Sequence, residues 1–263
     1  MSNKTLTLTI VIPAYNEQSY IKACLDSITK QTLMPDEVIL VDNNSTDKTV
    51  DIAKKYKFVK ILHEKRQHQV FAQATGFNAA KSDILGRIDA DTVLPNDWVD
   101  KVKRSFLNAA VVGVTGGAKP YDTPAESAML AGFNSYLFVV NLIVGHRMLW
   151  GANCAIRRSA WRKIRDQIMM RPDIWEDYDM SFCLSKYGKI IYLRNNKVGA
   201  SFRAVHTTFL KHAQYQFRAI RTFFHRANPV QIILFCMLWT TSLISYPFMA
   251  FDDWLLSRRG AKP

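Results

Sequence analysis

The stretch ATGFNAAKSDILGRIDADT, residues 74–92, carries the pattern that decides the fold of this 263-residue chain. It combines the end of a helical segment, the short and mainly apolar run Ile84–Ile88, and the polar turn Asp89-Ala90-Asp91. Short apolar runs bounded by turn residues are typical of strands buried inside a sheet. We therefore predict a strand here, with two carboxylates directly beyond its carboxyl end.

The segments on either side repeat the same alternation of strand and helix. Strands are expected at Leu6–Ile12, Glu37–Val41, Val59–Leu62 and Ile84–Ile88, and helices at Ser19–Thr29, Thr46–Tyr56, Val70–Ala80 and Asn96–Leu107. Alternation of this kind, with almost continuously apolar strands, is typical of a parallel sheet covered by helices on both faces. The sequence therefore predicts an α/β fold with a Rossmann-like, mostly parallel sheet.

Polar residues follow three of these strands, at the edge where ligands bind in such sheets. They are Pro13-Ala14-Tyr15-Asn16-Glu17, Asp42-Asn43-Asn44-Ser45-Thr46-Asp47 and Asp89-Ala90-Asp91. No GxGxxG or GxxxxGK[ST] pattern is present, which argues against a dinucleotide site and a P-loop. A tyrosine ring can pack on a base, and two aspartates separated by one residue can hold a divalent cation that also binds phosphates. This chemistry suits a nucleoside diphosphate.

These segments resemble the glycosyltransferase family 2 enzymes with the GT-A fold. The resemblance covers about residues 9–188 and rests on five motifs in the order of the family: VIPAYNE (11–17), VDNNSTDKT (41–49), ATGFNAAKSDILGRIDADT (74–92), LWGANCAIRRSAW (149–161) and EDYDMSFCLSKYGKI (176–190). It implies an inverting, metal-dependent transfer from a nucleotide-sugar donor to an acceptor hydroxyl or phosphate. The QxxRW pattern of processive members is absent, which indicates transfer of a single sugar.

The resemblance also implies roles on the donor side of the site. The DXD pair of the family corresponds to Asp89 and Asp91, which would bind Mn²⁺ or Mg²⁺ and, through Asp89, the sugar nucleotide. Its base-recognition positions correspond to Pro13, Tyr15, Glu17 and Asp42. The usual VDDGS reads VDNNS, with amides at Asn43 and Asn44, so UDP-sugars and GDP-sugars both stay open as donors.

The pair Glu176-Asp177 matches the ED motif of the family, whose carboxylate is the general base. The chemistry requires such a group, because a proton must leave the acceptor oxygen as it attacks the anomeric carbon from the face opposite the diphosphate. Asp177 is our first choice for the base and Glu176 the second, with Asp179 two residues further along the same helix start. The alternative is that these acids only stabilise the start of a helix.

Two further groups are candidates. Gly151 and Asn153 lie where the family places a loop that contacts the sugar, so the resemblance implies that they bind the nucleotide sugar; a turn with an exposed basic pair is the alternative. Lys65, Arg66 and Gln69 follow the third strand, where the family often directs polar groups toward the nucleotide.

The last third of the chain is strongly basic. The chain has 35 Lys and Arg against 22 Asp and Glu, a net charge of +13, and no carboxylate occurs between Asp179 and Asp252. Basic segments occur in proteins that bind nucleic acids, anionic membranes or phosphorylated substrates, so the neighbouring residues must decide. No known nucleic-acid-binding module is present, so we do not expect a nucleic-acid partner.

Two adjoining features favour a membrane. In residues 206–228, apolar side chains recur at helical spacing, at Phe209, Leu210, Ala213, Phe217, Ile220 and Phe224. The basic residues Lys211, Arg218, Arg221 and Arg226 fall mostly on other sides of this helix. The following residues, 230–251, form a 22-residue run without charge, long enough as a helix to cross a hydrocarbon core of about 30 Å. We expect a basic amphipathic interfacial helix over 206–228 and an apolar membrane anchor with a short tail over 229–263; a helix packed on the core is the alternative.

Residues 1–205 are then the GT-A catalytic domain, with a nucleotide-sugar half over about 1–120 and an acceptor half over about 121–205. A second uncharged run, Ser127–Gly145, is expected to be a buried or membrane-facing helix, because a crossing there would separate the DXD and ED motifs. No signal-peptide pattern opens the chain. We expect the catalytic domain to face the cytoplasm at the cytoplasmic membrane and to act on a lipid-linked or glycan acceptor in cell-envelope glycan or glycolipid synthesis.

Two other functions stay open. The acceptor could be soluble, with the C-terminal segment acting as an anchor, or the chain could be a catalytically silent protein that binds sugar nucleotides or membrane surfaces. The cysteines at 24, 154, 183 and 236 show no CxxC spacing, so we expect neither a disulfide nor a zinc site.

Overall fold

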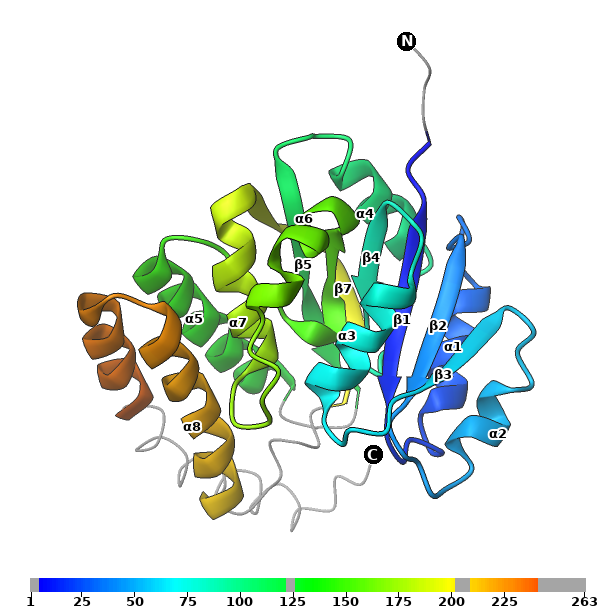
Figure 1. The fold of residues 1–263 in the computed structure, drawn as a ribbon, viewed down its shortest axis with the longest axis horizontal. Helices are drawn as coiled ribbons and strands as arrows, with labels where there is room; N and C mark the ends of the chain where they lie inside the picture. Colours follow the sequence, from blue (N-terminus) through cyan, green and yellow to red (C-terminus); the bar gives the residue numbers. More distant parts are fainter. Residues whose placement is uncertain (1–4, 122–125, 202–208, 241–263) are drawn as a thin grey trace.

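The structure is a computed structural model that describes residues 5–121, 126–201 and 209–240. Within these residues, seven strands form one sheet of order β3-β2-β1-β4-β6-β5-β7 (Figure 1). The strands are β1 (Leu8–Ala14), β2 (Glu37–Asp42), β3 (Val59–His63), β4 (Ile84–Arg87), β5 (Val111–Pro120), β6 (Cys154–Arg157) and β7 (Lys189–Ala200). The helices are α1 (Ile21–Thr29), α2 (Thr49–Ala53), α3 (Gln69–Ala79), α4 (Trp98–Ser105), α5 (Glu126–Val144), α6 (Arg158–Ile164), α7 (Glu176–Leu184) and α8 (Phe209–Arg226).

The parallel α/β fold predicted from the sequence is confirmed. Strands β3, β2, β1 and β4 pair in parallel, and all eight elements expected over residues 6–107 are present with shifted ends. Helix α2 is shorter than expected because Asp47 stays in the preceding loop, where its Oδ1 accepts a hydrogen bond from the Thr49 backbone amide at 2.9 Å.

Strand β6 is the exception to the parallel arrangement. It runs antiparallel between β4 and β5, with Arg87 of β4 opposite Cys154. The segment before β6 therefore lies at the same sheet edge as the segment after β4. This reversal brings residues 151–153 next to Arg87 and Thr92.

Each face of the sheet is covered by its own helices (Figure 1). One core contains Ile10 and Ile12 of β1 and the apolar sides of α1, α2 and α4. The other contains Val11 of β1 and residues of α3, α6 and α7. Because side chains alternate along a strand, a continuously apolar strand such as β1 supplies both cores.

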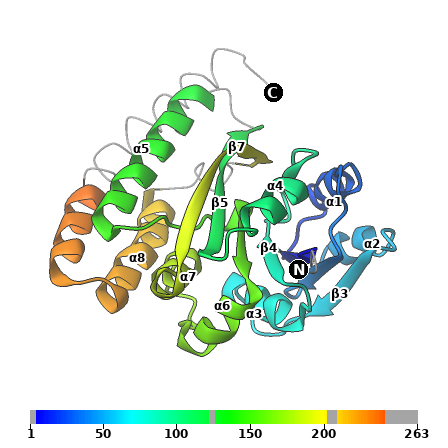
Figure 2. The ribbon, with the colours of Figure 1, turned by 90° about the horizontal axis from the view of Figure 1, so that it is seen from above.

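A third apolar cluster lies beside the sheet, where α5, α7, α8 and the helical residues 229–240 pack together (Figure 2). At its centre Phe223 of α8 stacks on Phe235, with ring centroids 3.7 Å apart. The helix predicted over 206–228 is present as α8, and its predicted apolar residues lie in two different environments. Ile220 is buried, whereas Phe217 and Phe224 are exposed.

Among the described residues, no helix has both the length and the apolar character needed to cross a membrane. The anchor expected from residue 229 is helical over 229–240, and the remainder of the predicted run lies outside the described residues. The uncharged run at 127–145 is helix α5, as expected. The four cysteines are free thiols.

Candidate active site

Segments distant in the sequence meet at one edge of the sheet. The parallel strands β1, β2 and β4 end there, and the 3-10 turn η1 (Gly151–Asn153) lies there because β6 is antiparallel. Helix α7 begins at this edge with Glu176 and Asp177, and the guanidinium of Arg87 bonds to its first turn. The DXD and ED motifs are thereby brought together, as the sequence predicts.

The Asp89 carboxylate lies at the mouth of this site. Its Oδ1 accepts hydrogen bonds from Gln69 Nε2 at 3.0 Å and from Arg87 Nη2 at 3.1 Å. About a third of the Asp89 side chain, 34%, stays exposed to solvent, so this carboxylate is accessible to a ligand. Asp91 follows in the same turn, and its backbone carbonyl accepts a hydrogen bond from the Tyr121 hydroxyl at 2.7 Å.

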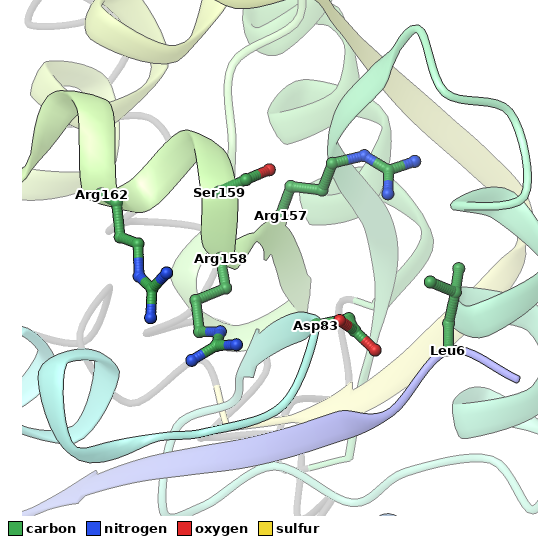
Figure 3. Close-up of a pocket in the computed structure, with 6 residues that line it drawn as sticks. All are labelled: Leu6, Asp83, Arg157, Arg158, Ser159 and Arg162. Carbon is green, nitrogen blue, oxygen red and sulfur yellow. The ribbon is translucent and has the colours of Figure 1, made fainter. Parts of the chain in front are cut away.

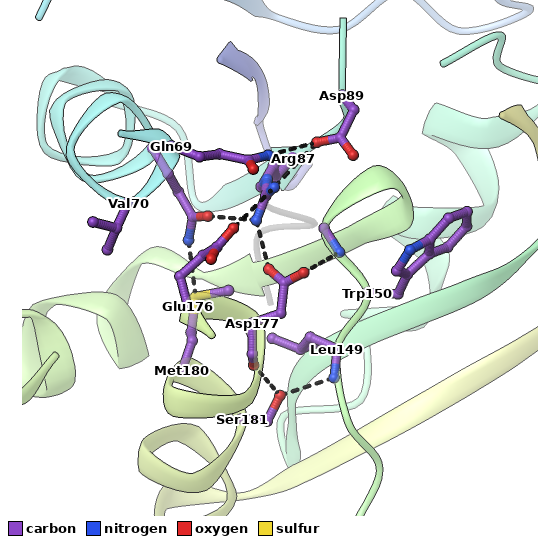
Figure 4. A network of polar contacts seen from close by, with 12 residues as sticks. Gln69, Val70, Arg87, Asp89, Leu149, Trp150, Glu176, Asp177, Met180 and Ser181 are labelled. Atoms are coloured by element: carbon purple, nitrogen blue, oxygen red, sulfur yellow. Dashed lines mark hydrogen bonds and ion pairs between the residues drawn. The ribbon is translucent and has the colours of Figure 1, made fainter. Parts of the chain in front are cut away.

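Arg87 is the buried centre of the site (Figure 4). It is 1% exposed and lies near three carboxylates, those of Asp89, Glu176 and Asp177. Its Nη1 also donates to Gln73 Oε1 at 2.6 Å. These surrounding carboxylates raise the pKa of Arg87 although burial opposes its charge, so the guanidinium stays protonated.

Both oxygens of Asp177 accept hydrogen bonds inside the protein. Oδ1 accepts from Arg87 Nη1 at 2.5 Å, and Oδ2 accepts from the Gly151 backbone amide at 2.8 Å. Burial raises the pKa of Asp177 to about 7, while the Arg87 charge acts in the opposite direction. A carboxylate whose pKa lies near neutrality is suited to accept a proton from an acceptor hydroxyl.

The other two acids of the first turn of α7 have different surroundings. Glu176 is buried, with its Oε1 3.6 Å from Arg87 Nη2. Asp179 is fully buried and faces away from this group, because it pairs with Arg226 of α8 at 2.6 Å and accepts from the Met169 backbone amide. The Asp179 carboxylate therefore holds α7 against its neighbours, and only Glu176 and Asp177 belong to the site.

The positions predicted to bind the nucleotide base lie around the ends of β1 and β2. Pro13 is buried within β1, Glu17 lies in the following turn, and Tyr15 is 50% exposed directly after the strand. Asp42 ends β2 and is 5% exposed; its Oδ1 accepts from the Ser45 backbone amide and its Oδ2 lies 3.1 Å from His63 Nδ1. Tyr15 is thus accessible from solvent, whereas Asp42 mainly shapes the loop.

Asn43 and Asn44 explain the departure from the usual motif. The Asn43 amide donates to the backbone carbonyls of Glu64 and Arg66, both at 2.8 Å, which a carboxylate cannot do. Asn44 has a φ of 68°, the left-handed region that asparagine tolerates better than most residues. These amides join the loop after β2 to the loop after β3.

The remaining candidates either contact the site or hold the protein around it together. Gln69 bonds to Asp89, whereas Arg66 pairs with Glu64 at 2.9 Å and holds the pKa of Glu64 down to about 2. The Asn153 amide bonds to the carbonyls of Gly117 and Asn196, and its oxygen accepts from the Trp98 indole at 2.8 Å. These three bonds use both amide hydrogens of Asn153, which is 1% exposed and holds the segments around it together.

The carboxylates at the mouth of the site suit a cation that is bound together with its substrate. Among the described residues, no group of three or more His, Cys, Asp or Glu side chains is placed to hold a metal ion unaided. Mg²⁺ is commonly bound by one or two carboxylates together with substrate phosphates and water. The accessible carboxylate of Asp89, with Asp91 two residues later, fits a cation of that kind.

A separate cavity of about 130 Å³ opens at the opposite edge of the sheet (Figure 3). Its lining residues are Leu6, Asp83, Arg157, Arg158, Ser159 and Arg162. The Arg157 guanidinium is already bound to the carbonyls of Val111, Phe106 and Asn108. None of the predicted site residues lines this cavity, so we do not assign the donor to it.

Sequence reasoning missed Arg87 and Gln73. The signal for Arg87 was present, because a charged residue inside the buried strand ILGR must have a charged partner in the fold. Gln73 gave no such signal, since a glutamine on a helix is ordinary.

The chain is similar in sequence to a known protein family and to individual proteins. The family model "Glycosyl transferase family 2" matches residues 9–165. The chain is 28% identical over 106 residues to the putative glycosyltransferase EpsH of Bacillus subtilis, covering 39% of this chain and 31% of that protein. It is 28% identical over 205 residues to the hyaluronan synthase of Pasteurella multocida, covering 74% of this chain and 20% of that protein. The chain thus spans a third or less of these two relatives.

Solved structures share the fold. The mannosyltransferase PcManGT from Pyrobaculum calidifontis, in complex with GDP-Man and Mn²⁺, superposes with a TM-score of 0.70 at 18% identity, covering 99% of this chain and 77% of that one. Residues 1–349 of S. aureus TarS, in complex with UDP-GlcNAc, give a TM-score of 0.57 at 18% identity, covering 74% of this chain and 58% of that one.

Proposed function

The chain belongs to glycosyl transferase family 2, and from this membership we propose that it transfers a single sugar, with inversion, from a nucleotide-sugar donor to an acceptor hydroxyl or phosphate. One observation carries the proposal. Arg87 and Asp177 are 90 residues apart in sequence, yet one guanidinium contacts both Asp177 and the donor-side Asp89. A donor carboxylate and a base candidate therefore share one site.

On the donor side, Asp89 and Asp91 would hold Mn²⁺ or Mg²⁺. The cation would stabilise the negative charge that develops on the departing diphosphate. The exposed ring of Tyr15 would pack on the base, and Pro13, Glu17 and Asp42 would shape its pocket. UDP-sugars and GDP-sugars are the donors we expect.

On the acceptor side, Asp177 would take the proton from the attacking hydroxyl. Its position beside Arg87 favours the ionised form, which the reaction needs, while burial keeps its pKa high enough to accept a proton. Glu176, the neighbouring carboxylate, is the second choice for the base.

We further propose that the enzyme works at the inner face of a cytoplasmic membrane on a lipid-linked acceptor. The support is the set of exposed apolar side chains that α5, α8 and residues 229–240 carry: Phe138, Leu142, Phe217, Phe224, Val230, Ile233, Leu234 and Met237. Arg221 and His225 are exposed on α8 beside Phe217 and Phe224. Apolar and basic side chains in this arrangement suit an anionic lipid surface.

Diphosphate binding tests the donor assignment. Detergent-solubilised protein is titrated with UDP, GDP, dTDP and CDP in Mn²⁺, Mg²⁺ or EDTA, and hydrolysis of the matching nucleotide sugars is then measured. Metal-dependent binding of one diphosphate with turnover supports the proposal. Binding without turnover on any acceptor favours the catalytically silent alternative, and no binding under any condition refutes the donor site.

Vesicle binding tests the membrane assignment. The double variant Phe217→Ser/Phe224→Ser should lose co-sedimentation with anionic vesicles, because both side chains would enter the lipid interface. Leu107→Ser is the matched control, since Leu107 is 73% exposed on another part of the fold. Equal binding of both variants to vesicles would refute the membrane face.

A further inference from the structure

The structure assigns a role to Arg87: we propose that it is a positioning residue that fixes Asp89 and Asp177 relative to each other, in a space that Gly151 leaves open. The inference rests on the proposed function and deepens it, because it says how the donor side and the acceptor side are held in register.

The guanidinium of Arg87 bonds to two carboxylates through different nitrogens. Nη1 bonds to Asp177 and Nη2 bonds to Asp89, so each carboxylate has its own nitrogen. Gln73 bonds to Nη1 as well, which restricts rotation of the guanidinium plane. The planar fork of arginine sets the spacing of its partners, which a lysine ammonium cannot do.

Arg87 is also buried more deeply than Asp89. It is 1% exposed, with its guanidinium bonded to residues of α3 and α7, whereas 34% of the Asp89 side chain reaches solvent. The guanidinium therefore lies beneath the reacting groups, where it can orient carboxylates but has little access to a substrate. This distinguishes a positioning residue from one that binds the diphosphate.

Gly151 leaves open the space that the Arg87 guanidinium occupies. A Cβ atom there would overlap the Arg87 guanidinium. The described glycines with a left-handed backbone are Gly145 and Gly188, so Gly151 is needed for space and not for its conformation. Its backbone amide also bonds to Asp177 Oδ2. Arg87, Gly151 and Asp177 thus form a closed set of contacts.

Arg87→Lys is the direct test, because it keeps the charge and removes the fork. We expect turnover to fall about 10²-fold, the usual effect of a misplaced reacting group. Affinity for the Mn²⁺–diphosphate complex should fall about tenfold, because Asp89 loses a charge-assisted hydrogen bond. The affinity is measured by calorimetry without any acceptor, so it does not depend on turnover.

A double-mutant cycle separates positioning from general damage. In an Asp177→Asn background, Arg87→Lys should cause little further loss of turnover, because the base that Arg87 positions is already absent. The same double variant should still lose diphosphate affinity through Asp89. Fully additive losses of turnover would overturn the inference.

Gly151→Ala is the second variant, since it displaces the guanidinium without changing any charge. Gly113→Ala is its matched control, because the added Cβ would lie 2.7 Å from Leu184 Cδ2 in the core, away from Arg87. We expect Gly151→Ala to reduce turnover at least tenfold more than Gly113→Ala at equal thermal stability. If folded Arg87→Lys and Gly151→Ala both keep wild-type turnover and diphosphate affinity, the positioning role of Arg87 is refuted while the proposed function stands. A wild-type protein that binds no diphosphate would overturn the proposed function and this inference together.

Discussion

Replacement of Arg226 by alanine should lower the stability of the whole protein, although the residue lies in a helix predicted to rest on a membrane. Arg226 Nε bonds to Asp179 Oδ1 at 2.6 Å, and the Asp179 side chain has no exposed surface. Arg226 also donates to the Gln167 carbonyl. The substitution therefore leaves a carboxylate in the interior without its cation.

The structure allows the magnitude to be estimated. Removal of one partner from a buried ion pair costs about 3–5 kcal/mol. Asp179 keeps the hydrogen bond from the Met169 backbone amide at 2.7 Å, so the lower end, about 3 kcal/mol, applies here. In a domain of this size each kcal/mol lowers the melting temperature by about 2–4 °C, which gives a decrease of about 6–12 °C.

Arg221→Ala is the matched control on the same helix. Arg221 pairs with Asp173 at 3.1 Å, but both side chains are exposed, at 58% and 31%. Exposed pairs contribute about 0–1 kcal/mol, so the melting temperature should fall by less than about 4 °C. Thermal unfolding of the solubilised proteins is followed by tryptophan fluorescence, which reports on this junction because the Trp175 side chain packs against the apolar cluster that includes residues of α8.

The double variant Arg226→Ala/Asp179→Asn completes the experiment. Without a buried charge to desolvate, it should be more stable than Arg226→Ala alone. The reasoning is refuted if Arg226→Ala and Arg221→Ala shift the melting temperature equally, or if removal of the Asp179 charge gives no recovery.

Four other changes test the site and the loop beside it. Asp177→Asn should reduce turnover by about 10²–10⁴ and leave diphosphate binding nearly intact, whereas Asp91→Asn should weaken both in the same calorimetric and kinetic assays. Turnover should rise as pH increases through about 7, where Asp177 ionises. The unfolding free energy of the metal-free protein should decrease as pH rises from about 4 to 7, because in that range only the folded state keeps the proton on Asp177. Asn43→Asp should cost about 3 kcal/mol in urea unfolding, since a buried carboxylate would face the carbonyls of residues 64 and 66.

The local features of the fold were predictable from the sequence. The strands ending at Ala14, Asp42 and Arg87 are apolar runs closed by turn residues, so their type and edge follow from composition alone. Asp89 and Asp177 could be named because each lies in a short motif directly after a strand or at the start of a helix.

Non-local features were not predictable in the same way. The direction of β6 depends on its pairing with β4 and β5, which its four residues do not encode. The buried face of α8 follows from contacts with α7 and residue 235, so Phe223 is buried while Phe224 is exposed. Arg87 was visible as a charge in an apolar strand, but its partner on α7 lies 90 residues away.

The fit between Arg87 and Gly151 also limits how this sequence can diverge. Any side chain at 151 would occupy the volume of the guanidinium, so the glycine is compulsory only while an arginine stands at 87. A smaller residue at 87 would remove that constraint, but Asp177 would then be buried without the guanidinium that pairs with it. We expect homologues to retain both residues or to exchange both, together with the acid that opens α7, and paired substitutions in aligned sequences would record this.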